Sequence, residues 1–239
     1  MDKTITLKDG RTLAYTEHGD PNGEPVFFVH GNPGSRYMRH PDEQLTASLG
    51  VRVITPDRPG YGLSDFQPGR TLLDYPDDLT ELADTLGIER FYVFGVSAGG
   101  PYVAATAYKL PERVIHAAIV SGPAPFDRED AMEGVSESFR IAYKSASQPA
   151  WLLRLLLNLQ VWNERRNPGK VWRDVLERAT EVDRDILLRP EIAEQVRAYR
   201  TETVRNGVKG WVQEARLLVS SWGFPLQAVQ PHVDLWYGA

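Results

Sequence analysis

Four short, largely apolar runs recur along the first half of the chain, and segments with helical periodicity lie between or beside them. The apolar runs are 26–29, 51–55, 91–94 and 114–120. Such runs are typical of strands that are buried on both faces of a parallel sheet. The predicted helical segments are 36–49, 72–86 and 101–110, and the first two are each followed by a glycine. This alternation predicts an α/β fold with a mostly parallel sheet.

The two ends of the chain extend this pattern. Residues 4–7 and 12–16 alternate around Asp9-Gly10, which predicts an antiparallel N-terminal hairpin. Residues 126–225 have helical periods without a convincing strand, and this insertion is too long for a simple crossover. We interpret it as a helical lid over the carboxyl edge of the sheet, where open α/β folds bind ligands. The predicted organisation is a single catalytic domain: core sheet 1–125, lid 126–225, and a return to the sheet over 226–239.

Composition excludes several classes of function. The 239 residues include no cysteine, which rules out disulfides, thiolate catalysis and cysteine metal sites within this sequence. A net charge of −5 argues against nucleic acid or an anionic membrane as the main partner. The N-terminus lacks the apolar region of a signal peptide. We therefore expect a cytoplasmic protein with a small-molecule substrate, and the oligomeric state stays open.

Ser97 is the predicted nucleophile. It is the centre of Gly95-Val96-Ser97-Ala98-Gly99, which follows the apolar run 91–94 and opens a helical segment. This strand–turn–helix context is what a nucleophile elbow requires, because a sharp turn must lift the serine hydroxyl above the sheet. The small neighbours give the turn the volume and the backbone freedom that it needs. The N-terminus of the following helix favours the negative charge that develops in acyl transfer.

Two backbone N–H groups are predicted to form the oxyanion hole. One is that of Ala98, the residue after the nucleophile, and the other is that of Asn32, in the loop after the run 26–29. Pro33, the next residue, has no N–H to donate. Loss of one such donor typically costs about 2.7–4 kcal/mol of transition-state stabilisation.

Three motifs in chain order carry a resemblance to a known family: His30-Gly31-Asn32-Pro33, the segment from Asp57-Arg58-Pro59-Gly60 to Ser64, and the Ser97 motif. Together they resemble the α/β-hydrolase fold family of bacterial esterase-like and haloperoxidase-like enzymes, and Trp222-Gly223-Phe224 is similar to the end of that family's lid. The resemblance implies a serine hydrolase that acts on a small ester or related carbonyl substrate.

The identity of two residues narrows the resemblance. Epoxide hydrolases and haloalkane dehalogenases of this fold carry aspartate at the elbow, where this chain has Ser97. Peptidases that remove N-terminal proline tend to carry tryptophan after the nucleophile, where this chain has Ala98. Carbon–carbon bond hydrolases and perhydrolases remain open alternatives to an esterase.

The resemblance does not supply the acid and the histidine of the family's catalytic triad within this sequence. The family orders its triad as nucleophile, acid and histidine. The resemblance places the acid about two positions past Ala239 and the histidine after one further strand, so we interpret the chain as C-terminally truncated, without the last strand and helix of the fold. Asp127, after the run 114–120, is the alternative acid. The alternative function is an inactive or non-catalytic hydrolase-fold protein.

Other polar residues have simpler interpretations. His116 and His232 are expected to lie far below the catalytic edge, as packed or surface histidines. We expect His30 to order the oxyanion loop, and Asp57 and Arg58 to stabilise the glycine turn that follows them. Of the tryptophans in 126–225, one or two at most should contact a ligand. The spacing of His, Asp and Glu predicts no metal site, and no cofactor motif is present.

Overall fold

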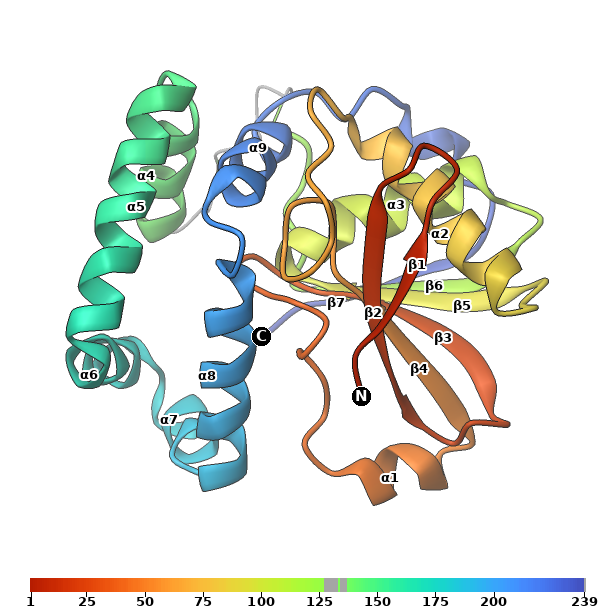
Figure 1. Ribbon diagram of the computed structural model, residues 1–239, viewed down its shortest axis with the longest axis horizontal. Coiled ribbons are helices and arrows are strands. Elements are labelled where there is room, and N and C mark those ends of the chain that lie inside the picture. Colours follow the sequence, from red (N-terminus) through yellow and green to blue (C-terminus); the bar gives the residue numbers. More distant parts are fainter. Residues whose placement is uncertain (127–132, 134–136, 239) are drawn as a thin grey trace.

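A seven-stranded sheet forms the centre of the molecule (Figure 1). The computed structural model describes residues 1–126, 133 and 137–238. The strands in this part of the chain are β1 (Lys3–Thr6), β2 (Thr12–Gly19), β3 (Glu24–Val29), β4 (Val51–Pro56), β5 (Phe91–Val96), β6 (Val114–Val120) and β7 (Val233–Trp236). Their order across the sheet is β1-β2-β4-β3-β5-β6-β7.

The direction of the strands decides where the loops meet. β1 and β2 pair antiparallel, as do β2 and β4, while every pair from β4 to β7 is parallel. The predicted mostly parallel sheet with an antiparallel N-terminal hairpin is therefore confirmed. Because β3, β4, β5 and β6 run in one direction, the loops after them emerge at one edge of the sheet, which is where α/β folds bind ligands.

Helices cover the sheet and extend beside it. Figure 1 shows α2 (Tyr75–Thr85) and α3 (Gly100–Lys109) over one face, with α1 (Glu43–Ser48) on the other. A separate group stands beside the carboxyl edge of the sheet, and we call it the helical segment: α4 (Glu137–Ala146), α5 (Ala150–Arg166), α6 (Pro168–Arg178), α7 (Glu181–Leu187), α8 (Pro190–Thr203) and α9 (Lys209–Leu218). Short 3-10 turns are η1 (Leu72–Asp74), η2 (Ser97–Gly99) and η3 (Leu226–Ala228).

The helix predicted over 36–49 is wrong for its first half, since only α1 forms there. The backbone N–H of Arg36 donates to the carboxylate of Asp57 at 2.6 Å, which holds this part of the chain in a loop. Pro41 disfavours helical backbone in the residue before it. Asp42 then starts the helix by accepting a hydrogen bond from the N–H of Leu45.

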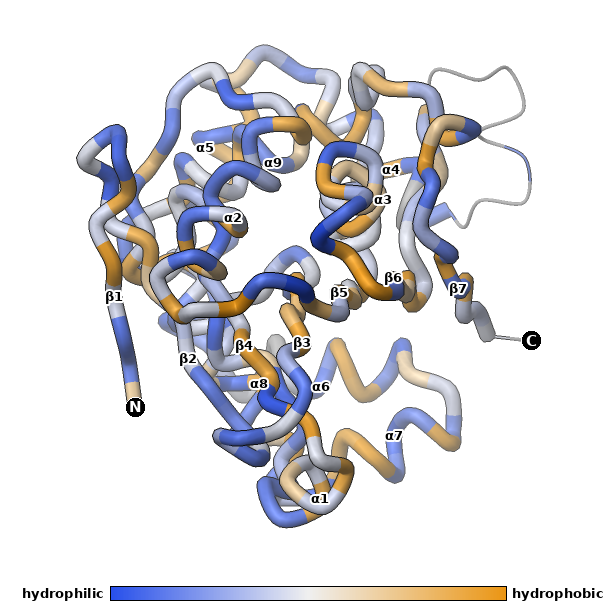
Figure 2. Tube along the Cα trace, turned by 90° about the vertical axis from the view of Figure 1, so that its right-hand side faces the viewer, coloured by the Kyte–Doolittle hydropathy of each residue, from blue (hydrophilic) through white to orange (hydrophobic). Residues whose placement is uncertain are grey.

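Two apolar clusters hold the molecule together. The main one lies between the sheet and the helices α2 and α3, and Figure 2 shows the hydrophobic positions along the central strands that feed it. The second lies within the helical segment, between α5 and α9 and the turn before α9; its buried members are Leu153, Leu157, Val161, Val204, Val208 and Val212. The helical segment therefore has a small core of its own and is not held by the sheet alone.

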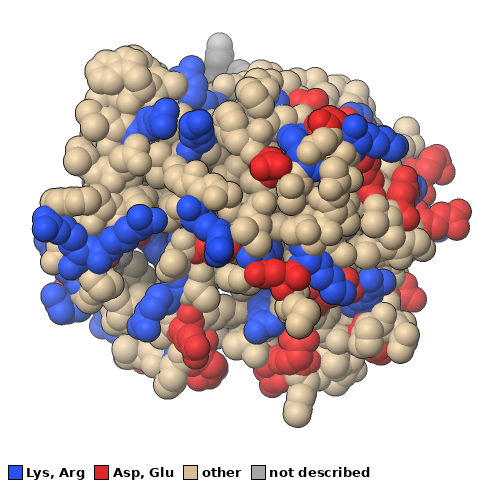
Figure 3. Space-filling view, viewed as in Figure 1, with Lys and Arg blue, Asp and Glu red and all other residues tan. Residues whose placement is uncertain are grey.

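Charge is unevenly spread over the surface. In Figure 3 Lys and Arg side chains gather at the left edge, where Figure 1 places α5 and α6, while Asp and Glu are more frequent on the opposite side. The exposed basic residues of these two helices include Arg165, Arg166, Lys170 and Arg173. Within the described residues, no helix combines the length and the apolar character needed to cross a bilayer.

Candidate active site

Ser97 occupies a strained turn between β5 and α3. Its φ is +52°, a left-handed conformation that non-glycine residues rarely adopt, and its side chain is exposed. Gly99 explains how the turn fits against the sheet, because a Cβ at this position would lie 2.2 Å from the carbonyl oxygen of Val29. Backbone strain of this kind persists where the surrounding structure holds it, and it is concentrated at functional sites.

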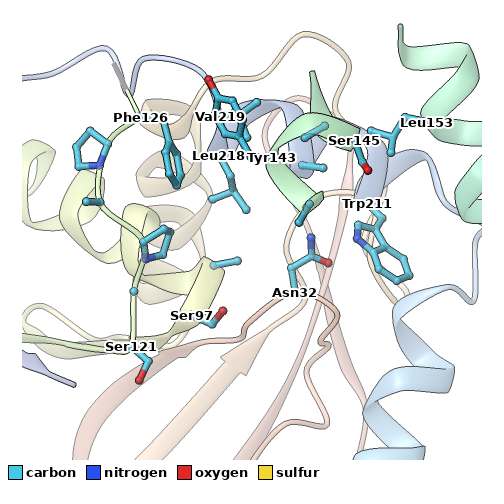
Figure 4. A pocket seen from close by; sticks show the side chains of 18 of the residues that line it. Asn32, Ser97, Ser121, Phe126, Tyr143, Ser145, Leu153, Trp211, Leu218 and Val219 are labelled. Carbon is cyan, nitrogen blue, oxygen red and sulfur yellow. The ribbon is translucent and has the colours of Figure 1, made fainter. Parts of the chain in front are cut away.

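The loop after β3 lies directly against this turn. A Cβ on Gly31 would be 3.3 Å from the carbonyl oxygen of Val96 and 3.5 Å from the Cβ of Ser97. Asn32 follows and lines the same cavity as Ser97 and Ala98 (Figure 4). Its side-chain oxygen accepts a hydrogen bond from the hydroxyl of Tyr61 at 3.3 Å. The structure thus brings together the three residues that the sequence singled out as nucleophile and oxyanion donors.

Arg58 connects the two loops from beneath. Its fully buried guanidinium donates from Nη1 to the carbonyl oxygen of Ala98 at 2.9 Å and from Nη2 to that of Gly31 at 3.0 Å. The expectation that Arg58 serves mainly the glycine turn is therefore wrong for its side chain. Charge-assisted hydrogen bonds of this type are about twice as strong as neutral ones, so Arg58 fixes the position of both loops around Ser97.

His30 supports the same loops and is not among the residues that line the cavity beside Ser97. It is fully buried, accepts a hydrogen bond from the N–H of Arg58 at Nε2 (3.2 Å), and has Nδ1 2.9 Å from the carbonyl oxygen of Gly31. Burial, and next the charge of Arg58, lower the pKa of His30 well below its usual value. A neutral, buried imidazole with both nitrogens in contact with the loops fits the predicted ordering role.

A buried ion cluster joins the helical segment to this arrangement. Glu214 of α9 lies 2.7 Å from Arg58 through one carboxylate oxygen and 2.7 Å from Arg70 through the other. The hydroxyl of Tyr102 also donates to Glu214 at 2.6 Å, and Arg70 donates to that hydroxyl. All these side chains are buried. The position of α9 is therefore tied electrostatically to the residue that holds the nucleophile turn.

A second buried cluster anchors α8. The Nη1 of Arg36 lies 2.6 Å from Asp57 and 2.7 Å from Glu202 of α8, and Thr203 donates to the carbonyl oxygen of Gly34 at 2.9 Å. Burial raises the pKa of Asp57 to about 6 against the opposing effect of the Arg36 charge. Asp57 also accepts from the N–H of Leu63 at 3.0 Å, so it stabilises the glycine turn as the sequence predicted.

The site opens into a cavity of about 980 Å³ between the loops and the helical segment. Figure 4 shows Ser97 and Asn32 at one side of it, with Leu218 and Phe126 facing them. Further apolar lining comes from the helical segment, namely Leu153, Leu157, Trp211, Ala215 and Val219. Trp211 is the one tryptophan among the described lining residues. Glu133 is the one formally charged residue among them.

The remaining candidate residues are Asp127, His116 and His232. Asp127, the alternative acid, lies outside the described residues. His116 and His232 do not line the cavity, and the described lining residues include no histidine. Both histidines instead contact Asp234, a cluster that spacing along the chain did not reveal because His116 is 118 residues from Asp234.

Comparisons with known proteins identify relatives of this chain among named proteins. The relatives include the uncharacterized hydrolase YcgS of Bacillus subtilis, 38% identical over 112 residues, which are 47% of this chain and 38% of that protein. They also include a non-heme chloroperoxidase of Streptomyces lividans, 37% identical over 125 residues, which are 51% of this chain and 45% of that one. The matched regions thus span less than half the length of these two curated relatives.

Solved structures show the same fold at lower identity. A thermophilic esterase from Thermogutta terrifontis superposes with a TM-score of 0.66 at 24% identity, covering 100% of this chain and 80% of that one. The model of the family described as alpha/beta hydrolase fold matches residues 24–225, which is most of the chain. This match confirms the family that the ordered motifs indicate: the protein belongs to the alpha/beta hydrolase fold family.

Proposed function

We propose that this protein is a serine hydrolase that acts on a small-molecule ester or related carbonyl compound through an acyl-enzyme on Ser97. The observation that carries the proposal is the positive φ of an exposed serine at the opening of a large apolar cavity. A hydroxyl presented in this way can attack a carbonyl carbon held in the cavity, and its neighbours are already positioned before the substrate binds.

The oxyanion hole of the proposal consists of the backbone N–H groups of Ala98 and Asn32. Ala98 is the second residue of η2, and the first N–H groups of a helix have no acceptor within it. No described residue accepts a hydrogen bond from the N–H of Asn32. Two N–H groups beside the nucleophile, on loops that Arg58 holds, are what a tetrahedral oxyanion needs.

The lining and the volume of the cavity indicate which class of substrate it would bind. Its lining is mostly apolar and comes in part from the helical segment, which we propose acts as a lid. Apolar lining favours an uncharged acyl or alcohol group, since an isolated charge would lose its hydration there. The volume of about 980 Å³ is at the upper end of ordinary ligand pockets. Medium-length aliphatic or aromatic esters are therefore the proposed substrates.

The names of the relatives support hydrolysis over a purely structural role. Besides the hydrolase, the chloroperoxidase and the esterase already described, the relatives include a bifunctional esterase/perhydrolase of Acinetobacter calcoaceticus, 29% identical over 122 residues. That protein combines two acyl-transfer activities in its name, so a perhydrolase reaction of the same acyl-enzyme is part of the proposal. The central step in both reactions is acylation of Ser97.

One observation favours a second candidate function, ligand binding without turnover. The described residues that line the cavity include no histidine that could take the proton of the Ser97 hydroxyl. Without a base, an oxyanion hole and a binding site still give roughly 10³–10⁴-fold catalysis over water, so weak ester hydrolysis does not separate the two candidates.

Covalent labelling separates them. A fluorophosphonate probe should label the 239-residue chain on Ser97 within minutes if a base activates the hydroxyl, and Ser97→Ala should abolish the label. Ser121→Ala is the matched control, because Ser121 also lines the cavity with a φ of +50°. Labelling as slow as that of free serine, or labelling that survives Ser97→Ala, would overturn the hydrolase proposal and leave ligand binding.

A further inference from the structure

Two histidines and an aspartate meet on one face of the sheet, between β6 and β7 and away from Ser97. In the parallel register of these strands Ala117 pairs with Val233 and Ala118 with Asp234. The N–H of Ala117 also donates to the carbonyl oxygen of His232 at 3.1 Å. Side chains alternate between the faces of a sheet with a period of two, so His116, His232 and Asp234 project from the same face.

The polar atoms of the three side chains converge. The Nε2 of His116 lies 2.8 Å from one carboxylate oxygen of Asp234, and the Nε2 of His232 lies 3.0 Å from the other. The two imidazole rings are 5.0 Å apart between centroids. One ligand atom from each residue can be chosen so that all three lie within 4.8 Å of one another.

We propose that His116, His232 and Asp234 form a binding site for a divalent transition-metal ion of the Zn²⁺ type. Two imidazole nitrogens and one carboxylate are a donor set that Zn²⁺ and Co²⁺ accept, whereas Mg²⁺ and Ca²⁺ prefer oxygen ligands. A tetrahedral ion at about 2.0–2.2 Å from each ligand holds its ligand atoms roughly 3.3–3.5 Å apart. The three ligand atoms now lie within 4.8 Å of one another, so they must move closer together when an ion binds.

Two imidazoles contact one carboxylate here, whereas a simple ion pair needs only one. The Nε2 atoms of both imidazoles contact the one carboxylate of Asp234, so the three polar groups converge. Their side chains are 39%, 72% and 43% exposed for His116, His232 and Asp234, which leaves room for water to complete the coordination of an ion.

The site is structural in this proposal and separate from the hydrolase chemistry. His116 is four residues before the end of β6 at Val120, which places it about 13 Å below the edge where Ser97 lies. An ion bound by His116 of β6, by Asp234 of β7 and by His232 just before β7 would link the last strand to the sheet. Binding should therefore raise the melting temperature while ester hydrolysis stays unchanged.

Metal titration of the 239-residue chain tests the site. After chelator treatment, one equivalent of Co²⁺ should produce visible absorption typical of bound cobalt, Zn²⁺ should displace it, and Zn²⁺ should raise Tm. His232→Ala and Asp234→Asn should each weaken Zn²⁺ binding about tenfold or more. His40→Ala is the matched control, since His40 is exposed and outside the cluster. Circular dichroism checks that each variant is folded, and His232→Ala decides the matter because its side chain is the most exposed.

Each other outcome overturns the proposal. Absence of cobalt absorption at millimolar Co²⁺ means that the three groups form only hydrogen bonds. Equal weakening by His40→Ala and His232→Ala means adventitious binding to surface histidines. A binding constant unchanged by both His232→Ala and Asp234→Asn places the ion elsewhere. None of these results depends on labelling of Ser97, so failure of this site and failure of the proposed hydrolase are distinguishable.

Discussion

The Nη1 of Arg58 donates a hydrogen bond to the carbonyl oxygen of Ala98 at 2.9 Å, directly behind the turn that presents Ser97. The same nitrogen lies 2.7 Å from Glu214 of α9. One buried cation thus holds the nucleophile turn and the helical segment at once. Arg58 and Glu214 are not among the described residues that line the cavity, so the turn that carries Ser97 is held from outside the cavity.

Arg58→Lys should slow acylation of Ser97 strongly. An ammonium cannot reproduce the two donors that hold Ala98 and Gly31, because it is a point charge without the planar fork of guanidinium. We expect a loss of about 10²-fold in the labelling rate, similar to the loss of one oxyanion donor. Arg70→Lys is the control, since Arg70 contacts the same Glu214 but neither loop. Equal losses in both variants would contradict a positioning role for Arg58.

Glu214→Gln should destabilise the whole protein. The substitution keeps the shape of the side chain but leaves two buried guanidiniums, those of Arg58 and Arg70, without their counter-charge. Removal of one partner from a buried ion pair typically costs about 3–5 kcal/mol. Urea denaturation measures the change in the free energy of unfolding. Glu164→Gln breaks a partly exposed pair with Arg200 and should cost less than about 1 kcal/mol; similar costs for the two would refute the account of the cluster.

Gly99→Ala should prevent the nucleophile turn from fitting against β3. The new methyl would lie 2.2 Å from the carbonyl oxygen of Val29, a backbone atom that cannot move without shifting the strand. We expect a loss of at least about 3 kcal/mol of stability. In Gly169→Ala, by contrast, the methyl meets nothing nearer than 3.9 Å, and helix propensity favours alanine. Thermal melts of both variants give the comparison, and a stable Gly99→Ala would rule out the close approach.

Leu218→Trp should shift substrate preference toward shorter acyl groups. Leu218 lines the cavity opposite Ser97 (Figure 4), so a larger side chain there fills space that a long acyl chain would use. One methylene in an apolar pocket is worth about 10–200-fold in discrimination. The ratio of kcat/KM for butyrate and octanoate esters should rise by about tenfold or more. Leu156→Trp, on an exposed position of α5 outside the lining, should leave the ratio unchanged.

Stability should fall as the pH drops from about 6.5 toward 4, in part because of His18. Burial, and next the charge of Arg39, lower the pKa of His18 to about 4. Its Nδ1 is 2.6 Å from Nη1 of Arg39, and this contact requires an unprotonated nitrogen. The unfolded chain takes up a proton near pH 6.5 while the folded chain does not, so folding is favoured above that pH and penalised below it.

His18→Gln should flatten this dependence. The free energy of unfolding, measured with urea at pH 7.5 and pH 5, should differ less for the variant than for the wild-type chain. The exposed His40 supplies the control, since His40→Gln should keep the full difference. A wild-type chain as stable at pH 5 as at pH 7.5 would contradict the neutral state of His18.

The sequence could predict features that depend on residues close together in the chain, but not those that depend on contacts between distant segments. That Ser97, Ala98 and Asn32 lie beside one cavity could be predicted, because a strand–turn–helix motif and an adjacent loop contain their whole context. The helix predicted over 36–49 was wrong in its first half because Asp57, from another loop, accepts a hydrogen bond from the backbone N–H of Arg36. Glu214 was missed for the same reason, since nothing near it in the chain shows that it meets Arg58 and Arg70. The pairing of His116 with Asp234 likewise exists only through the register of β6 and β7.

The most direct test of the central claim is the mass of the protein during turnover of a slow ester. If Ser97 is the nucleophile, rapid quenching after addition of a p-nitrophenyl ester should trap one acyl group per chain. Peptide mapping should then place it on Ser97, and Ser97→Ala should show no adduct. An acyl group on any other residue, or release of p-nitrophenol at the wild-type rate by Ser97→Ala, would contradict the account.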